Sequence, residues 1–237
     1  MIEKNIFQSW CTKALHPIIQ QKIDFFKKIN PEYTHYLYDD ADMDNFVNEH
    51  FKGEIAECYN KLNIIVAKVD FWRYLVLYKY GGIYLDMDSS IEAPLNNLIR
   101  EDDEAIITAE GNPGFYVQWA LIFSKQHPIL KKTIELVVNN IKNNRHPNDI
   151  HKTTGPTVYS RAINAFHMEL FNGEIINHAQ INTNTDTTYK SDATSYRLYG
   201  KDYNIYFRFR HDAIHLLYNG KKHWRQEERE KNLLKCV

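Results

Sequence analysis

Hydrophobic and polar residues follow two spacings along this chain, and these predict short strands interleaved with helices. The aromatic and β-branched run at residues 4–10 predicts a first strand, and residues 33–38 predict a second. Between them, apolar residues at helical spacing predict a helix from Pro17 to about Ile29, which Asn30-Pro31 ends. Further along, the pattern predicts helices over about 42–50, 60–80, 129–143, 157–166 and 224–234, and strands over 83–85, 104–109, 204–209 and 213–217.

Strands that alternate with helices predict an α/β fold, in which a mostly parallel central sheet is covered by helices on both faces. No internal repeat and no low-complexity linker interrupts the 237 residues. We therefore expect a single domain over residues 1–237, long enough to bury one core. Boundaries within 180–204 cannot be assigned, because that segment is polar and rich in Thr and Tyr.

The composition argues against several classes of function. With 29 basic and 30 acidic residues the formal net charge is −1, so no bulk field favours nucleic acid as a partner. No apolar run reaches the roughly 18 residues of a membrane span, and the N-terminal residues lack the apolar region of a secretory signal. Cys11, Cys58 and Cys236 lack metal-site spacing and are expected to be reduced. We expect a cytoplasmic protein, compatible with peripheral attachment to a membrane.

The segment 68–92 carries the most informative polar residues. Asp70 and Arg73 are three apart on a predicted helix and therefore project from one face. In the strand that follows, alternation places Tyr84, Asp86 and Asp88 on one side. Mg²⁺ and Mn²⁺ prefer carboxylate oxygens and substrate phosphates as ligands, and α/β sheets bind ligands at the carboxyl ends of their strands. The sequence therefore predicts a divalent-metal site at Asp86 and Asp88.

Other interpretations of the acidic residues compete with this one. A lone Asp-x-Asp is most often a solvated turn. A calcium loop of the EF-hand type is excluded, because Ile91 stands where that loop requires Gly. The acidic run at 39–44 is a rival metal site, although acidic residues at a helix start are already explained by capping and by the helix dipole.

The block that carries this chemistry consists of Asp70-x-x-Arg73, Leu75 and Gly81-Gly82-x-Tyr84-x-Asp86-x-Asp88. It resembles the sugar-binding region of the DXD glycosyltransferases, in the family 32-like group that joins yeast outer-chain mannosyltransferases with bacterial capsule and lipopolysaccharide sugar transferases. The glucosylating domains of large clostridial toxins are similar. The resemblance implies a GT-A (Rossmann-like) fold, with residues 1–110 as the nucleotide-sugar and metal-binding half. Residues 111–237 would then be the acceptor half and C-terminal lid.

The resemblance also implies roles for single residues. Asp86 and Asp88 would hold Mn²⁺ or Mg²⁺, with His215 of the closing loop as a third ligand, and Asp70 and Arg73 would bind the donor sugar. Two positions depart from the family pattern: Phe7 replaces a usual His, and His223-Trp224 replaces the common Ser-Trp. The implied catalytic residues are Asp70, Arg73, Asp86 and Asp88; the donor-binding ones are Phe7, Gln8, Trp10, Asp70, Arg73, Tyr84, Lys222 and Trp224; and the acceptor side has Gln118, Gly155 and Pro156.

The implied reaction is metal-dependent transfer of a sugar from a nucleotide-sugar, with retention of the anomeric configuration. A UDP-sugar is the first choice of donor and GDP-mannose the second. The acceptor would be a growing glycan of polysaccharide biosynthesis, a lipid-linked sugar or a protein. Two alternatives use the same residues: a metal-dependent nucleotidyltransferase or phosphoesterase, and an inactive sugar- or nucleotide-binding protein of this fold.

Overall fold

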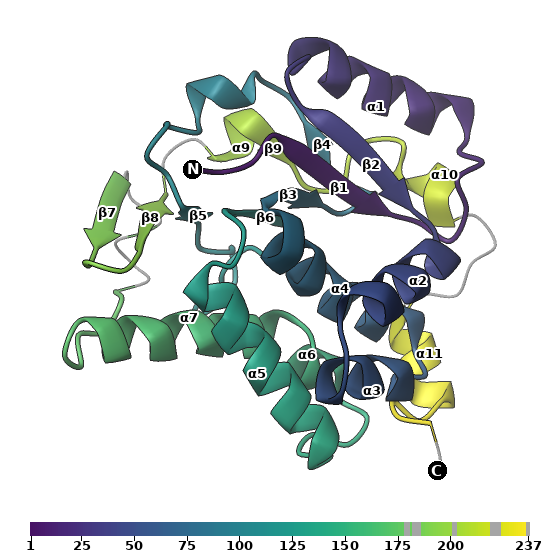
Figure 1. Ribbon diagram of the computed structural model, residues 1–237. Coiled ribbons are helices and arrows are strands. Elements are labelled where there is room, and N and C mark those ends of the chain that lie inside the picture. Colours follow the sequence, from purple (N-terminus) through teal and green to yellow (C-terminus); the bar gives the residue numbers. More distant parts are fainter. Residues whose placement is uncertain (178–180, 182–185, 201–202, 219–223, 236–237) are drawn as a thin grey trace.

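The computed structural model of the chain describes residues 1–177, 181, 186–200, 203–218 and 224–235. Its centre is a mixed sheet with strands in the order β2-β1-β3-β6-β5-β8-β7 (Figure 1). A small second sheet pairs β4 with β9. The strands are β1 (Asn5–Ser9), β2 (Thr34–Tyr38), β3 (Gly82–Leu85), β4 (Ser90–Ile91), β5 (Ala105–Ile107), β6 (Ala120–Phe123), β7 (Asp186–Lys190), β8 (Ser195–Tyr199) and β9 (Phe207–Arg208).

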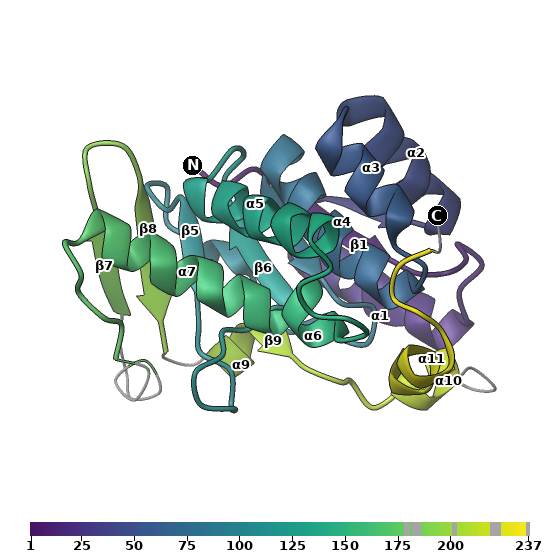
Figure 2. The same ribbon diagram turned by 90° about the horizontal axis from the view of Figure 1, so that it is seen from below.

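Helices cover both faces of the large sheet, as the sequence predicts. In Figures 1 and 2, α4, α5 and α7 lie on one face and α1 lies on the other. The helices are α1 (Pro17–Ile29), α2 (Asp40–His50), α3 (Glu54–Lys61), α4 (Ile65–Tyr80), α5 (Pro128–Lys142), α6 (Ile150–Thr153), α7 (Pro156–Leu170), α9 (Tyr203–Tyr206), α10 (Ile214–Tyr218) and α11 (Trp224–Glu230), with a 3₁₀ turn η1 (Leu95–Asn97).

Alternation along the strands divides the core into two layers. Phe7, Tyr84 and Leu121 face the layer under α4, α5 and α7. Ile6 and Ile83 face the opposite layer, where they pack with the apolar side of α1. The central strands β3 and β6 are therefore buried on both faces, as expected for a sheet covered by helices on both sides.

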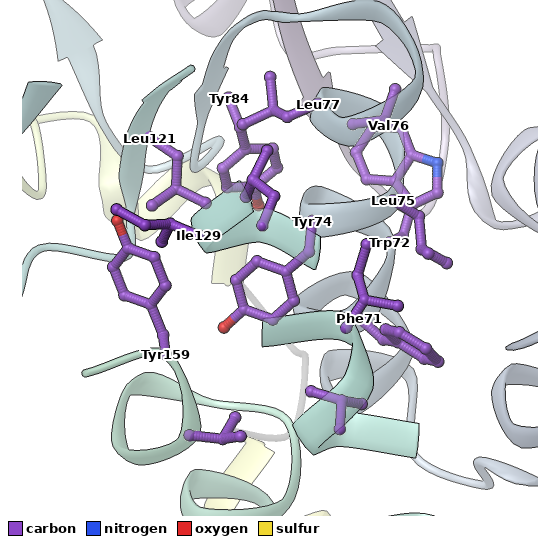
Figure 3. Close-up of a cluster of buried hydrophobic side chains, with 14 of the residues drawn as sticks. Phe71, Trp72, Tyr74, Leu75, Val76, Leu77, Tyr84, Leu121, Ile129 and Tyr159 are labelled. Atoms are coloured by element: carbon purple, nitrogen blue, oxygen red, sulfur yellow. The ribbon is translucent and has the colours of Figure 1, made fainter. Parts of the chain in front are cut away.

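Helix α4 is enclosed by other elements along most of its length. Its residues from Asp70 to Leu77 are all buried. Figure 3 shows Phe71, Trp72 and Tyr74 of this helix within the cluster that also contains Tyr84. A helix that is buried all round normally carries apolar residues only. The charged Asp70 and Arg73 on α4 therefore need partners inside the protein.

The turn from α4 into β3 depends on two glycines. Gly81 caps α4 at a φ of 64° and Gly82 has a φ of 111°, both in the region that favours glycine. A Cβ on Gly82 would also lie 2.5 Å from the Asn5 carbonyl oxygen of β1. This close approach brings β3, and the residues after it, beside β1.

The structure corrects several sequence predictions. The sheet is mixed rather than mostly parallel, because β6 runs antiparallel to both β3 and β5. The helix predicted over 60–80 is interrupted at 62–64, where the Asn63 backbone N–H donates to the Leu233 carbonyl at 2.8 Å. The strand predicted at 213–217 is the short helix α10, and only Phe207–Arg208 of the strand predicted at 204–209 is extended.

Within the described ranges, no helix combines the length and the apolar composition that are needed to cross a membrane.

Candidate functional site

Three parallel strands end at the same edge of the sheet, and the predicted site lies there. β1 pairs in parallel with both β2 and β3. Their carboxyl ends are followed by Trp10, Asp39 and Asp86, respectively. The Trp10 N–H donates to the Tyr38 carbonyl at 2.9 Å, which joins two of these strand ends. This is the edge at which open α/β sheets bind ligands.

Asp86 begins a tight turn that leaves β3. The Ser89 N–H donates to the Asp86 carbonyl at 3.0 Å, and the Asp86 N–H donates to the Trp119 carbonyl at 2.8 Å. The buried amide of Gln8 adds a third contact, from Nε2 to the Asp86 carbonyl at 3.3 Å. The backbone of Asp86 is therefore fixed from three elements, while its side chain keeps a 28% exposed fraction.

Arg73 is the centre of the buried charged cluster. Its Nη2 lies 3.0 Å from Asp70 Oδ1 and 3.3 Å from Asp86 Oδ1. Its Nη1 donates to the Gln118 carbonyl at 3.0 Å. The guanidinium carbon lies 4.5 Å from the ring centroid of Tyr84, and the Tyr84 hydroxyl donates to Asp86 Oδ1 at 2.6 Å. The helix and the strand are thus joined through Arg73.

The second carboxylate oxygen of Asp70 faces the start of α7. Thr154 donates to Asp70 Oδ2 at 3.3 Å, and the hydroxyl of Tyr74 donates to the Thr154 carbonyl at 2.9 Å. A Cβ on Gly155 would lie 3.3 Å from the same Asp70 oxygen and 2.9 Å from His151 Cα. A glycine at this position therefore allows the α6–α7 connection to approach Asp70. The Gln118 amide donates to the Tyr74 hydroxyl and completes this buried network.

The cluster holds more negative than positive charge. The carboxylates of Asp70 and Asp86 contact the buried Arg73 guanidinium, and the Asp88 carboxylate interacts with the charges of Asp86 and Arg210. Burial raises the pKa of Asp70 to about 6; Arg73 opposes this and Asp86 adds to it. Burial, and then the neighbouring Asp86, raises the pKa of Asp88 to about 6. Carboxylates whose pKa values are raised by burial beside a specific charge partner are often found at functional sites.

Asp88 is held by the C-terminal segment of the chain. Its carboxylate accepts from Ser89 Oγ at 3.3 Å, and the Tyr218 hydroxyl of α10 approaches its other oxygen at 3.5 Å. The ring of Tyr218 stands edge-on to Trp10, with centroids 5.7 Å apart. The predicted base-stacking residue Trp10 therefore lies beside the aspartate pair.

Other predicted site residues lie at different distances from this cluster. Phe7 is buried in the core and stacks on Tyr36 and Tyr80. Pro156 is the first residue of α7. His215 is exposed on α10, and the described residues contain no group of three His, Cys, Asp or Glu side chains able to hold one metal ion. Lys222 and the side chain of Trp224 lie outside the described residues. At the rival acidic run, Asp39 and Asp42 form a capping box at the start of α2.

Several residues of the site were not identified from the sequence. The His211 N–H donates to the Asp88 carbonyl at 2.8 Å, and its Nε2 lies 3.3 Å from the Met87 carbonyl. Tyr74, Thr154 and Tyr218 also contact the cluster. Tyr74 could have been found from its place four residues after Asp70 on one helix face. The others come from distant segments, and only the Thr154-Gly155-Pro156 turn marks one of them.

Comparison with known families relates part of this chain to a described family. Residues 17–105 match the family described as "Glycosyltransferase sugar-binding region containing DXD motif". This segment is therefore similar to the sugar-binding region of DXD glycosyltransferases. The matched part contains the Asp70–Arg73 pair and the Asp86–Asp88 turn, so the resemblance predicted from the sequence is confirmed.

Two curated fungal proteins are similar to the chain around this sugar-binding region. The initiation-specific alpha-1,6-mannosyltransferase of Candida albicans is 23% identical over 201 residues, covering 68% of this chain and 52% of the relative. The inositol phosphoceramide mannosyltransferase 3 of Schizosaccharomyces pombe is 29% identical over 137 residues, covering 56% of this chain and 36% of the relative. The chain thus spans about half the length of the first relative and less of the second.

A solved structure, the PaToxG glycosyltransferase, is similar in fold. It aligns with a TM-score of 0.57 at 21% identity, and the alignment covers 72% of this chain and 71% of that chain. At this identity the likeness concerns the fold alone, and it confirms the predicted GT-A α/β architecture around the sugar-binding region.

Proposed function

We propose that this protein is a metal-dependent glycosyltransferase that moves a hexose from a nucleotide-sugar to a hydroxyl acceptor. The observation that carries the proposal is that one buried side chain, that of Arg73, contacts both Asp70 and Asp86 at the carboxyl end of β3. It lies inside the segment that matches the DXD sugar-binding region. A charged cluster of this kind is costly to bury, and a ligand that uses its charge explains why it is kept.

Asp86 and Asp88 are the proposed metal ligands. Carboxylate oxygens are what Mn²⁺ and Mg²⁺ prefer, and such sites often use one or two carboxylates together with substrate phosphates. The excess negative charge and the raised pKa of Asp88 fit a divalent cation at this turn. The donor diphosphate, rather than further protein side chains, would complete the ligand set. His215 of α10 stays a predicted third ligand.

Asp70 and Arg73 are proposed to bind the donor sugar, and Trp10 its base. Arg73 presents fixed donors from within the core, and Asp70 accepts on both of its oxygens. Because the surrounding Thr154, Gln118 and Tyr74 are buried, these groups are held in place before the donor arrives. Gly155 and Gln118 lie on the side of the charged cluster that Asp70 occupies, and we propose that the acceptor binds there.

The proposed reaction retains the anomeric configuration. A bound divalent cation would stabilise the negative charge that develops on the leaving nucleoside diphosphate. The acceptor oxygen forms its bond to the anomeric carbon on the face from which the diphosphate leaves, and a phosphate oxygen of the leaving group takes the acceptor proton. This chain then has to position two substrates and to hold charge, and it needs no strong protein base.

The donor follows from two lines of support. The sequence resemblance favours a UDP-sugar, with GDP-mannose as the second choice. The curated relatives named above are mannosyltransferases, which brings a mannosyl donor into the first test. A glycan or a glycolipid headgroup is the proposed acceptor class.

The test is release of nucleoside diphosphate from a panel of UDP-, GDP- and ADP-sugars with Mn²⁺. We expect release from one donor that disappears with EDTA and in an Asp88→Asn variant. Release of nucleoside monophosphate instead would indicate a phosphoesterase or nucleotidyltransferase. Absence of release from every donor, with no nucleotide-dependent rise in melting temperature, would contradict the proposal.

A further inference from the structure

One buried histidine outside the matched region contacts the backbone of the Asp86–Ser89 turn. His211 has a 2% exposed fraction. Its backbone N–H donates to the Asp88 carbonyl at 2.8 Å, and its ring Nε2 lies 3.3 Å from the Met87 carbonyl. A carbonyl oxygen can only accept, so the ring must carry its proton on Nε2 to make this hydrogen bond. Two successive peptide units of the turn are thus held by one residue.

The chain before His211 is shaped to bring it there. β9 pairs with β4 in an antiparallel register that places Phe207 opposite Ile91 and Arg208 opposite Ser90. Arg210 then adopts a φ of 52°, in the left-handed region that a bulky residue rarely occupies. This reversal directs His211 back onto the turn. Backbone strain of this kind is often kept at functional sites.

A purely structural role explains the histidine poorly. Its Nδ1 is buried and finds no hydrogen-bond partner among the described residues. A buried polar atom without a partner costs about 1–3 kcal/mol, which an apolar side chain of similar volume would avoid. What an apolar side chain could not supply is the hydrogen bond to the Met87 carbonyl, between the two aspartates.

The turn needs such support because of its charges. Asp86 and Asp88 are like charges two residues apart, and without a cation they favour a turn in which they separate. Asp86 is anchored through its side chain by Arg73 and Tyr84. Within the described residues, the hydrogen bonds to the Asp88 carboxylate are the longer ones from Ser89 and Tyr218, at 3.3 and 3.5 Å. The orientation of Asp88 therefore depends chiefly on its backbone, which His211 holds.

We propose that His211 is a positioning residue that fixes the Met87–Asp88 backbone and thereby sets the Asp88 carboxylate for a divalent cation. The inference rests on the proposed function, because it assumes that Asp86 and Asp88 bind that cation. Partners that orient metal ligands are typically worth 10–100-fold in metal affinity. His211 would contribute in this way from 124 residues along the chain.

The test is Mn²⁺ affinity, measured by the free Mn²⁺ signal in electron paramagnetic resonance, for a matched pair of variants. In His211→Gln the amide nitrogen takes the place of Nε2, whereas in His211→Asn it takes the place of Nδ1. We expect Asn to weaken Mn²⁺ binding about 10–100-fold and Gln to recover most of the loss. Melting temperatures in EDTA report stability separately.

A second buried histidine provides the control. His167 of α7 is also buried, has one ring nitrogen without a partner among the described residues, and contacts Tyr196 on the far side of the core. His167 contacts Tyr196 through Nδ1, so the variant that loses its contact is His167→Gln. His167→Gln should lower the melting temperature and leave Mn²⁺ affinity within about 2-fold of wild type. If His211→Asn and His167→Gln lowered stability and Mn²⁺ affinity alike, His211 would be structural only.

The outcomes separate this inference from the proposed function. Wild type that binds Mn²⁺ in an Asp88-dependent way, together with an equal affinity in His211→Asn, would overturn the positioning role alone. Wild type that binds no Mn²⁺, with or without a nucleoside diphosphate, would overturn both. Weaker Mn²⁺ binding in His211→Asn, recovered in His211→Gln, would support the positioning role.

Discussion

Two buried arginines of this chain each contact two aspartates, and their surroundings differ. Arg197 donates from Nε and Nη2 to the two oxygens of Asp103, at 2.8 and 2.5 Å, and also to the Leu98 carbonyl at 2.6 Å. Arg73 uses the single nitrogen Nη2 for one oxygen each of Asp70 and Asp86. The Nε of Arg73 has no partner within the described part of the chain.

The difference separates a bidentate ion pair from a cluster in which two carboxylates share one guanidinium nitrogen. The Arg197–Asp103 pair is bidentate, which is the strong geometry for such pairs. Beside Arg73, burial raises the pKa of Asp70 to about 6, and burial raises that of Asp88, the next carboxylate after Asp86, to about 6 as well.

The largest effect that we predict is loss of activity in Asp88→Asn. Removing a ligand charge from the proposed metal site should lower sugar transfer about 10³-fold, or about 4 kcal/mol. Stability should change by less than about 1 kcal/mol, because folding already disfavours the Asp88 charge. Turnover with Mn²⁺ and urea unfolding of the same preparation measure the two effects. Asp44→Asn, in the rival acidic run, is the control that should keep full turnover.

A substitution in the Arg197–Asp103 ion pair should instead have its main effect on the stability of the fold. Asp103→Asn leaves the buried Arg197 charge without its bidentate partner, and we expect stability to fall by about 3 kcal/mol. Urea unfolding measures the loss, and the exposed neighbour Asp102→Asn should stay within about 0.5 kcal/mol of wild type. A small loss in Asp103→Asn would mean that the two arginine clusters do not differ as described.

The buried histidine His127 should make the stability of the folded protein depend on pH. Burial lowers its pKa from 6.5 to about 4, although its contacts with Ser195 and Glu104 oppose this. Between these values the unfolded chain binds the proton and the folded protein does not, so stability is lost as the pH falls. The loss from His127 should reach about 2 kcal/mol by pH 5. His127→Asn keeps a residue that can cap α5, and its urea midpoint should fall less steeply with pH than that of wild type.

The smallest effect should come from Asp70→Asn. The pKa of Asp70 is already raised to about 6 by burial, so loss of its charge should change stability by less than about 1 kcal/mol. Donor KM should rise about 10-fold, or about 1.4 kcal/mol, because an amide donates where the sugar hydroxyl needs an acceptor. Initial rates over a donor concentration series measure this. An unchanged KM would remove Asp70 from the donor-binding residues.

The sequence predicted the parts of the fold and site that depend on local pattern. Pro17 to Ile29 forms the predicted helix, and the Asp70–Arg73 contact follows from their spacing on α4. The interruption before α4 was missed because its hydrogen bonds go to the C-terminal Asn232 and Leu233. Strand β6 was missed because four buried apolar residues carry no periodicity.

The site was predicted incompletely for the same reason. Tyr218 reaches Asp88 from 130 residues away, and Thr154 reaches Asp70 from 84. No spacing in the sequence relates residues so far apart, because only the packing of the C-terminal segment and of α7 brings them together. The alternation that placed Tyr84 and Asp86 on one side was sufficient, since their contact is local.

The most direct test of the proposed metal and donor site is a crystal structure with MnCl₂ and the nucleoside diphosphate of the preferred donor. We predict an anomalous difference peak at the manganese edge between the carboxylates of Asp86 and Asp88, in contact with the diphosphate. The peak should be absent in Asp88→Asn crystals grown in the same way. A peak at the 39–44 run instead, or no peak at either place with the nucleotide bound, would contradict the assignment.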